Sequence, residues 1–401
     1  MLRDMRISLS LVGVSVALLG ACSDDPDESD ATGALQPGAS AGSGGASAGS
    51  SVAAGSGGGA GEASGGAGSS SEGVDDDAPL DTSGDQGANG GSAGTGSVPP
   101  PVADAGAPPA TGPVCPSGPF AADPLAGAAA PQEACTNLAF TEGAVWFAER
   151  NTLFFSDIVF NNPTPEIAGR ILSFTPGGAC EPFIENAGTN GLVIAPDGNL
   201  LSARHGDRTL TLFDLETRAP TVFLADNDGV AFNSPNDIAL RSDGNLYFTD
   251  PNYGLGGGMP AQPARAYHRD PSGALTVIDE QGNSNGITLS PDESRLYLSH
   301  LGSPQDNVIV FDIDASGAPV NPQPFITDGG SDGMGIDCAG NLYITQDGAV
   351  EVYAPDGTQV GTIPAPQAAN VAFGGPDRRT LFITAGTTLL SVELAIPGLR
   401  Y

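Results

Sequence analysis

The sequence predicts an all-β protein, a six-bladed β-propeller preceded by a disordered N-terminal linker. Three observations support this fold class: a six-fold repeat of a polar residue followed by a leucine, a strand–turn–strand pattern inside each repeat, and the lack of convincing amphipathic helices. Pro and Gly interrupt every long window that could otherwise form a helix. A repeat of about 40 to 50 residues built from short strands is typical of a propeller, with one repeat per blade.

The repeat is carried by a carboxylate or carboxamide residue that stands 10 or 11 positions ahead of a strand-like leucine. The leucines recur at intervals of 47, 46, 50, 46 and 39 residues. We expect each polar residue to open the innermost strand of its blade, so that six oxygen-bearing side chains converge at one mouth of the central channel. The six pairs are Glu142/Leu153, Asn190/Leu200, Asn236/Leu246, Asn285/Leu296, Asp332/Leu342 and Asn370/Leu381.

Each repeat continues with a turn rich in Gly and Asp and then a second apolar strand. In the third repeat, residues 236–240 run into the turn Ser242-Asp243-Gly244-Asn245 and then into residues 246–249. Asp-Gly and Gly-Asn between apolar strands are strong signals for a hairpin. The pattern therefore predicts that consecutive strands pair as antiparallel neighbours within a blade.

The N-terminal residues 1–21 are predicted to be a lipoprotein signal peptide. Two arginines precede an apolar run over residues 7–19, which is short for a membrane span. The run ends in Leu19-Gly20-Ala21-Cys22, which looks like a bacterial lipobox and makes Cys22 the predicted lipidation site. Ser23 lacks the aspartate typical of inner-membrane retention, so an outer-membrane lipoprotein is expected. The alternative is an ordinary signal peptide cleaved nearby at small residues.

Residues 22–114 are predicted to form a disordered linker between the lipid anchor and a folded domain. They consist mainly of Gly, Ala and Ser with scattered acidic residues and Pro. Such a segment buries too little apolar surface to offset the entropy of ordering. We therefore expect an exported protein of the bacterial cell envelope that contacts the membrane only through its anchor.

Residues 115–401 are long enough for one large domain, which we assign to the propeller. The net charge of −33 argues against nucleic acid as a partner, because phosphate contacts need clustered basic residues. Four cysteines remain after Cys22, and in an exported chain they are expected to form two disulfides. Three pairings are open for Cys115, Cys135, Cys180 and Cys338.

The polar residues at the channel mouth suit a hard divalent cation, which prefers oxygen ligands. Glu142 and Asp332 balance the charge of one Ca²⁺, while Asn236 and Asn285 add neutral carbonyl oxygens. Mg²⁺, Mn²⁺ or Zn²⁺ is an alternative occupant, because carboxamide-rich sites discriminate weakly. Asn-Gly and Asp-Gly also form turns, so each repeat could use them only to start a strand. Glu142 has no turn-forming role and favours metal binding.

Five short motifs follow one another along the domain. They are Glu142-Gly143-Ala144-Val145-Trp146, Ser234-Pro235-Asn236-Asp237, Phe248-Thr249-Asp250-Pro251, Ser284-Asn285-Gly286 and Ser331-Asp332-Gly333-Met334. In this order and spacing they resemble the gluconolactonase family, which includes senescence marker protein and luciferin-regenerating enzyme. The resemblance covers essentially the whole domain from about Cys135 onward. The segment from Asn190-Gly191 through residues 204–208 also looks like the second blade of bacterial members.

The resemblance implies that Glu142, Asn285 and Asp332 bind the metal directly, with Asn236 beside it as a ligand or a substrate contact. It departs from the family at Ser234, where animal members carry an arginine that helps to hold a sugar lactone; this leaves the substrate preference open.

The implied activity is a metal-dependent, calcium-using hydrolase that opens small sugar-type lactones such as gluconolactone. The metal would polarise the lactone carbonyl while water attacks it. Asp332 is the candidate general base, with His205 as the alternative or as a substrate-orienting residue. Asn190, Asn236 and Tyr253 are expected to contact the substrate, and the protein is expected to be a monomer. A phosphotriesterase-like hydrolase and a non-catalytic binding propeller with a structural metal remain the alternatives.

Overall fold

The computed structural model describes residues 115–160, 169–252, 254–255, 259–302, 306–346 and 348–399. The chain divides into Met1–Ala93 and Gly94–Tyr401, and all described residues belong to the second unit. The predicted signal peptide at residues 1–21, its lipidation site Cys22, the predicted linker at residues 22–114 and Tyr253 lie outside the described residues. Their assignments stay predictions, as does the domain boundary at residue 115.

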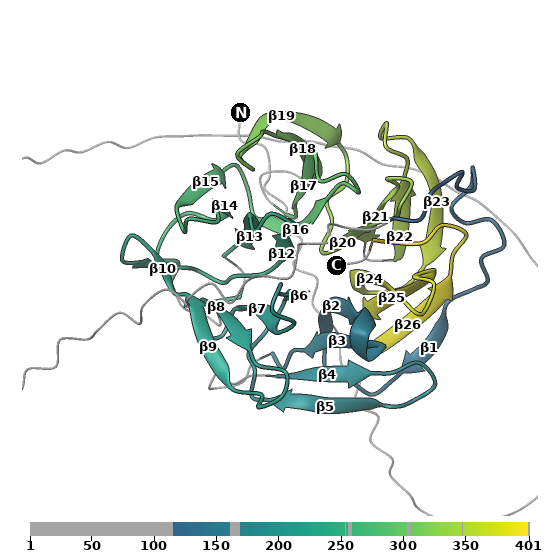
Figure 1. Ribbon diagram of the computed structural model, residues 1–401, viewed down its shortest axis with the longest axis horizontal. Coiled ribbons are helices and arrows are strands. Elements are labelled where there is room, and N and C mark those ends of the chain that lie inside the picture. The colour runs from purple at the N-terminus through teal and green to yellow at the C-terminus, as the bar shows by residue number, and fades with distance from the viewer. Residues whose placement is uncertain are drawn as a thin grey trace, which may run out of the picture. The chain divides into compact units, whose positions relative to one another are not determined.

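Six four-stranded antiparallel sheets surround a common axis, which confirms the predicted all-β propeller with six blades (Figure 1). In five blades the strands follow one another in chain order from the axis outward. A separate two-stranded hairpin, β10 (Asp226–Asn227) with β11 (Val230–Ala231), lies in the connection from the second blade to the third.

Blade one holds β2 (Thr141–Phe147), β3 (Thr152–Asp157), β4 (Arg170–Phe174) and β5 (Cys180–Glu185). Blade two holds β6 (Leu192–Ile194), β7 (Leu200–Arg204), β8 (Thr209–Phe213) and β9 (Pro220–Leu224). Blade three holds β12 (Ile238–Leu240), β13 (Leu246–Asp250), β14 (Arg265–Arg269) and β15 (Leu275–Asp279). Blade four holds β16 (Ser284–Leu289), β17 (Arg295–His300), β18 (Asn307–Ile313) and β19 (Pro319–Ile326). Blade five holds β20 (Met334–Ile336), β21 (Leu342–Gln346), β22 (Ala349–Tyr353) and β23 (Gln359–Pro364).

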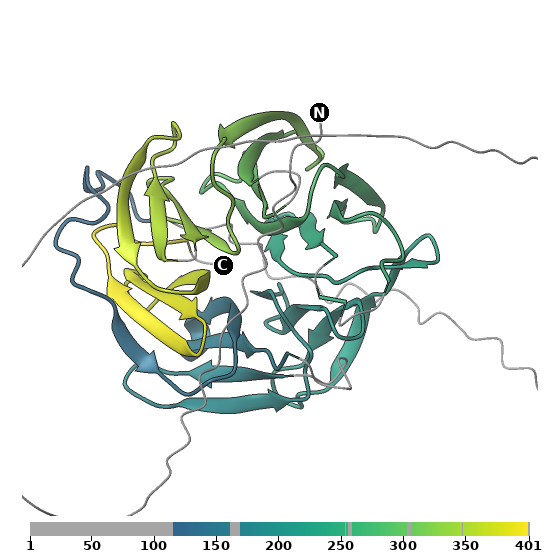
Figure 2. The ribbon, with the colours of Figure 1, turned by 180° about the vertical axis from the view of Figure 1, so that it is seen from behind.

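The sixth blade closes the ring by combining both ends of the folded chain. Its inner strands are β24 (Ala368–Gly374), β25 (Thr380–Ala385) and β26 (Thr388–Glu393), and its outer strand is the N-terminal β1 (Gln132–Cys135). The register pairs Gln132 with Ser391 and Cys135 with Leu389. Viewed from behind, β1 lies beside the yellow C-terminal strands (Figure 2). The first and last parts of the propeller are therefore held in one sheet.

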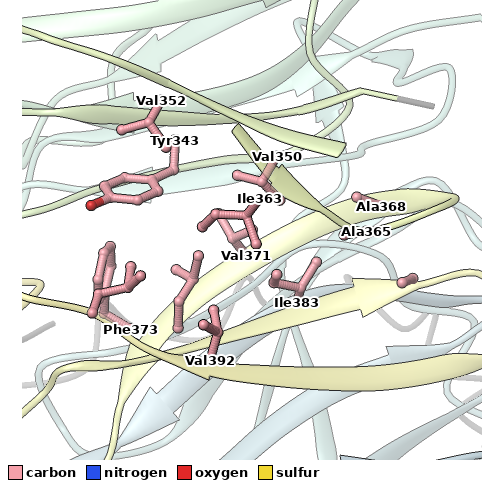
Figure 3. Packing of buried hydrophobic residues seen from close by; sticks show 13 residues of the cluster. Tyr343, Val350, Val352, Ile363, Ala365, Ala368, Val371, Phe373, Ile383 and Val392 are labelled. Atoms are coloured by element: carbon pink, nitrogen blue, oxygen red, sulfur yellow. The ribbon is translucent and has the colours of Figure 1, made fainter. Parts of the chain in front are cut away.

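The core lies mainly between neighbouring blades, where the faces of adjacent sheets pack together. Between blades five and six, Tyr343 and Val352 face Phe373 and Val392 in one buried cluster (Figure 3). The repeating leucines are also interior: Leu153, Leu200, Leu296, Leu342 and Leu381 are fully buried, and Leu246 is 1% exposed. Each of them stands at the start of the second strand of its blade, which explains the period seen in the sequence.

Two disulfides form, as predicted, and the structure selects one of the three pairings. Cys115 pairs with Cys338, and Cys135 pairs with Cys180. The second bond connects β1 of blade six to β5 of blade one. It therefore joins the two blades that meet where the ring closes.

The described residues contain no α-helix; their one helical turn is the 3-10 element η1 (Ala148–Arg150) between β2 and β3. Within the same residues, no helix has the length and apolar character needed to cross a membrane.

Candidate active site

The six polar residues all lie within the first three positions of an innermost strand or two positions before it, close to the predicted place. Glu142, Asn285 and Asn370 fall inside β2, β16 and β24, while the other three stand two residues before β6, β12 and β20. All of them are buried except Asp332, which is partly exposed. We call these six residues, Glu142, Asn190, Asn236, Asn285, Asp332 and Asn370, the polar ring.

Backbone contacts between neighbouring blades hold the members of the polar ring close together. The amide of Gly191 donates to the carbonyl of Asn236 across 2.7 Å. A Cβ at Gly143 would lie only 1.9 Å from the carbonyl oxygen of Asn190, and Gly143 has a φ of 51°. Only glycine allows this approach of two blades. The Gly that follows several polar residues is thus a packing requirement of the ring.

Hydroxyl groups on the second strands fix the ring from behind. Ser156 donates to the carbonyl of Asn190 at 2.6 Å, and Thr249 donates to the carbonyl of Asn285 at 2.8 Å. Ser299 and Thr345 make equivalent bonds to Ser331 and Ala369 in the next blade. Sequence reasoning missed these residues, although each of them stands three positions after the repeating leucine of its blade. That spacing was the signal that could have found them.

Glu142, Asp332 and Asn285 form the charged centre of the ring. The amide Nδ2 of Asn285 donates to Asp332 Oδ1 at 2.7 Å, and the amide of Gly143 donates to Glu142 Oε2 at 3.1 Å. Burial raises the pKa of Glu142 well above its ordinary value, and the neighbouring charge of Asp332 raises it further. Two carboxylates are therefore held together in a setting that disfavours two negative charges.

Asp237 is a third carboxylate of this site, and sequence reasoning gave it no role. Its Oδ1 accepts from the amide of Ile238 at 2.9 Å, and its Oδ2 accepts from the amide of Ile287 at 3.2 Å. Burial raises its pKa to about 7, against the lowering effect of these two backbone donors. Asp237 therefore bridges blades three and four directly behind Asn236. Its neighbours become visible only in the fold, because Ile287 is 50 positions away.

The donor set fits a hard divalent cation. Because the Asn285 amide nitrogen is used by Asp332, the amide carbonyl oxygen is the atom left for a ligand role. A cation beside Glu142 and Asp332 would relieve the repulsion that raises the pKa of Glu142. The described residues contain no group of three or more His, Cys, Asp or Glu side chains arranged for a metal. The polar ring differs from such clusters because most of its members are carboxamides.

His205 lies beside the ring, in the turn between β7 and β8. Its Nδ1 is buried and has no hydrogen-bond partner. Burial, and then the neighbouring Arg204, lower its pKa to about 4. The other two histidines are occupied: His268 contacts Asn245 at 2.6 Å, and His300 contacts Asp279 at 2.9 Å and Asn307 at 2.8 Å. His205 is thus the histidine with a free nitrogen at this site.

The low pKa of His205 predicts a specific dependence of stability on pH. A histidine that is neutral when folded, with a pKa lowered from 6.5 to about 4, stabilises the fold above pH 6.5 and loses this contribution as the pH falls to about 4. We expect wild type to lose on the order of 2 kcal/mol more than His205→Gln across this window. Urea unfolding at pH 7 and pH 4.5 measures the difference.

The difference between wild type and His205→Gln cancels the contributions that other titrating groups make to the unfolding free energy. Burial is the main cause that raises the pKa of Asp250 to about 6. This carboxyl group therefore makes the fold more stable as the pH falls, and it does so equally in wild type and in His205→Gln. Parallel losses of unfolding free energy in wild type and His205→Gln would contradict the assignment.

A cavity of about 650 Å³ occupies the channel behind the ring. Apolar residues of the innermost strands line it, among them Val145, Ile238 and Val371, and it reaches Arg241 and Arg378 in the turns at its far end. Asp237 and Asn370 are the only members of the site that it touches. Glu142 and Asp332 do not line this cavity, because they lie at the other mouth of the channel.

Six blades around a mouth of buried carboxylate and carboxamide groups define the class of protein: a six-bladed propeller with an oxygen-donor site on its axis. Residues 140–387 match the family described as SMP-30/Gluconolactonase/LRE-like region. This match covers more than half of the chain, so the chain belongs to that family.

Individual relatives agree with this membership. A gluconolactonase of Zymomonas mobilis subsp. mobilis is 34% identical over 285 residues, which is 64% of this chain and 79% of the relative. A pentonolactonase of Haloferax volcanii is 27% identical over 268 residues, covering 62% of this chain and 82% of the relative. The structure of a gluconolactonase from Xanthomonas campestris matches with a TM-score of 0.58 and 28% identity, over 70% of this chain and 99% of that one.

Proposed function

We propose that the protein is a hydrolase of small sugar-type lactones such as gluconolactone. The observation that carries this proposal is the Glu142–Asp332–Asn285 centre on the propeller axis, since this oxygen-donor set suits a carbonyl-activating cation. The gluconolactonase and pentonolactonase among the relatives support the choice of lactones as substrates.

We propose Ca²⁺ as the cofactor, with Zn²⁺, Mn²⁺ or Mg²⁺ as alternatives. Glu142, Asn285 and Asp332 would hold it, and Asn236 lies beside them as a ligand or a substrate contact. When bound, the cation supplies Lewis-acid polarisation of the lactone carbonyl and stabilises the charge that develops on its oxygen.

The chain's own residues orient the substrate and handle the proton. Asn190 and Asn236 present carboxamides that can hold the ring substituents of the lactone. Water attacks the carbonyl carbon, the bond to the ring oxygen breaks, and this oxygen leaves with a proton as the alcohol. Asp332, oriented by the amide of Asn285, is the proposed proton acceptor. His205, neutral at pH 7, is the alternative acceptor or an orienting group.

We further propose that the enzyme is an exported, monomeric lipoprotein of the outer membrane. Residues 7–19 and the lipobox ending at Cys22 support this lipid anchor. Mass spectrometry of the mature protein tests this proposal. A diacylglycerol mass on Cys22 is expected, whereas an N-terminus at another residue without lipid would contradict it.

Hydrolysis of glucono-1,5-lactone, followed at constant pH by the acid released, tests the proposed function. We expect saturable hydrolysis well above the spontaneous rate, and the same assay with a phosphotriester addresses the phosphotriesterase alternative. Hydrolysis of the phosphotriester alone would overturn the proposed substrate class. Turnover of neither substrate with any added divalent cation would favour a binding propeller.

A further inference from the structure

A second polar cluster lies beside the polar ring, between blades two and three. Arg208 follows the turn between β7 and β8, and its Nε donates to the carbonyl of Phe232 at 2.5 Å. Phe232 begins the segment that continues through Ser234 to Asn236 of the ring. The side chain of Arg208 is therefore tied to the backbone that carries a residue of the proposed active site.

This cluster contains two buried polar atoms without hydrogen-bond partners. They are Nη2 of Arg208 and Nδ1 of His205, three residues apart in one turn. A buried polar atom left without a partner destabilises the fold unless water or a ligand satisfies it. Neither atom has a partner among the described residues of the protein, so water or a ligand is needed to satisfy each of them.

The surrounding charged groups are already engaged. Asp250 accepts from the amide of Ser234 at 2.6 Å and from the amide of Asn233 at 2.9 Å. Asp207 pairs with Arg204 and also accepts from Thr209 at 2.9 Å. Asp250 lies close enough to Arg208 for the guanidinium to lower its pKa. The positive charge of Arg208 is thus balanced within the protein, and the free Nη2 is left as a hydrogen-bond donor.

Gly254 packs closely against both His205 and Ser234. A Cβ at Gly254 would lie 1.8 Å from Ser234 Oγ and 3.2 Å from the Cβ of His205. The backbone of Gly254 therefore lies against both residues, which come from blade two and from the segment that leads into blade three.

We propose that Arg208 and His205 form a subsite that hydrogen-bonds the hydroxyl groups of a neutral, polyhydroxylated lactone; this inference rests on the proposed function. Arginine only donates hydrogen bonds, whereas a neutral imidazole nitrogen can accept one. A hydroxyl group both accepts and donates, so hydroxyl substituents of one lactone can satisfy either atom. A carboxylate would only accept, and an alkyl substituent would leave both atoms unpaired.

The test compares two lactones that share a six-membered ring. Glucono-1,5-lactone carries hydroxyl substituents and δ-valerolactone carries none. With the full-length protein, we expect Arg208→Met to lower kcat/KM for gluconolactone by about 30-fold, and that for δ-valerolactone by less than threefold, because a site built to bind a hydroxyl discriminates through that contact.

Arg218→Met is the matched control. Arg218 lies in the same blade, also has a positive φ, and places its guanidinium 4.7 Å from the ring centroid of Phe183. Arg218→Met should leave kcat/KM unchanged for both lactones. If Arg208→Met does not fold, Arg208→Lys replaces it, because this variant keeps the charge and a hydrogen-bond donor. We expect Arg208→Lys to lower kcat/KM for gluconolactone by less than tenfold.

Equal losses on both lactones, or no loss on gluconolactone, would overturn the subsite while leaving the proposed function intact. A wild-type protein that hydrolyses neither lactone would overturn the proposed function and the subsite with it.

Discussion

Glu142→Gln is expected to lower lactone hydrolysis by about a thousandfold while leaving the metal-free protein at least as stable as wild type. Glu142 is proposed to hold a carbonyl-polarising cation, so loss of its carboxylate should remove stabilisation that is needed in the transition state. Stability should not suffer, because burial and Asp332 make the charged form of Glu142 unfavourable. A neutral amide of the same shape removes that repulsion.

The experiment measures kcat/KM for gluconolactone and the unfolding midpoint of each variant in chelator and in excess Ca²⁺. Glu149→Gln is the control, since Glu149 is an exposed residue of η1 in the same blade. It should match wild type in every measurement. Full activity of Glu142→Gln would rule out the proposed role, and a large loss of stability with unchanged activity would indicate a structural metal.

Replacing both Cys135 and Cys180 by Ser is expected to cost about 4 kcal/mol of unfolding free energy, the loop-entropy value for a separation of 45 residues. The bond also connects β1, the outer strand of blade six, to β5 of blade one. Its loss therefore weakens the closure of the ring. Urea unfolding of oxidised wild type and of the double variant measures the effect.

Activity of the double variant at low temperature distinguishes an effect on ring closure from an effect on catalysis. The polar ring lies on the innermost strands, whereas the disulfide lies on the outer strands, so the kcat of the folded protein should stay within about threefold of wild type. A loss of unfolding free energy below about 1 kcal/mol would contradict a role for this bond in ring closure.

The blade count and the inner strands could be predicted because they leave a periodic trace. Leu153, Leu200 and their counterparts are buried at one equivalent position in every blade, so packing imposes a repeat on the sequence. Strand β1 leaves no such trace. Its four residues, Gln132–Cys135, alternate weakly and pair with Ser391 and Leu389 at the far end of the chain.

The convergence of the polar ring could be predicted from the sequence, but the surroundings of the ring could not. Glu142, Asn285 and Asp332 come together as expected, because each opens an innermost strand. The roles of Asp237 and Arg208 depend on backbone groups contributed by other segments, Ile287 and Phe232. Such contacts have no local signature. The disulfide pairing was open for the same reason, because the positions of four cysteines in a sequence do not show which of them lie close together in the fold.

Ca²⁺ dependence of gluconolactone hydrolysis tests the central claim most directly. The protein is stripped with chelator and titrated with Ca²⁺ while hydrolysis is followed. We predict negligible activity without metal and a saturable recovery with one binding constant. The unfolding midpoint should rise with the same constant, because a ligand that binds only the folded state stabilises it by mass action. Full hydrolysis of gluconolactone in excess chelator would contradict a metal-assisted site at the polar ring.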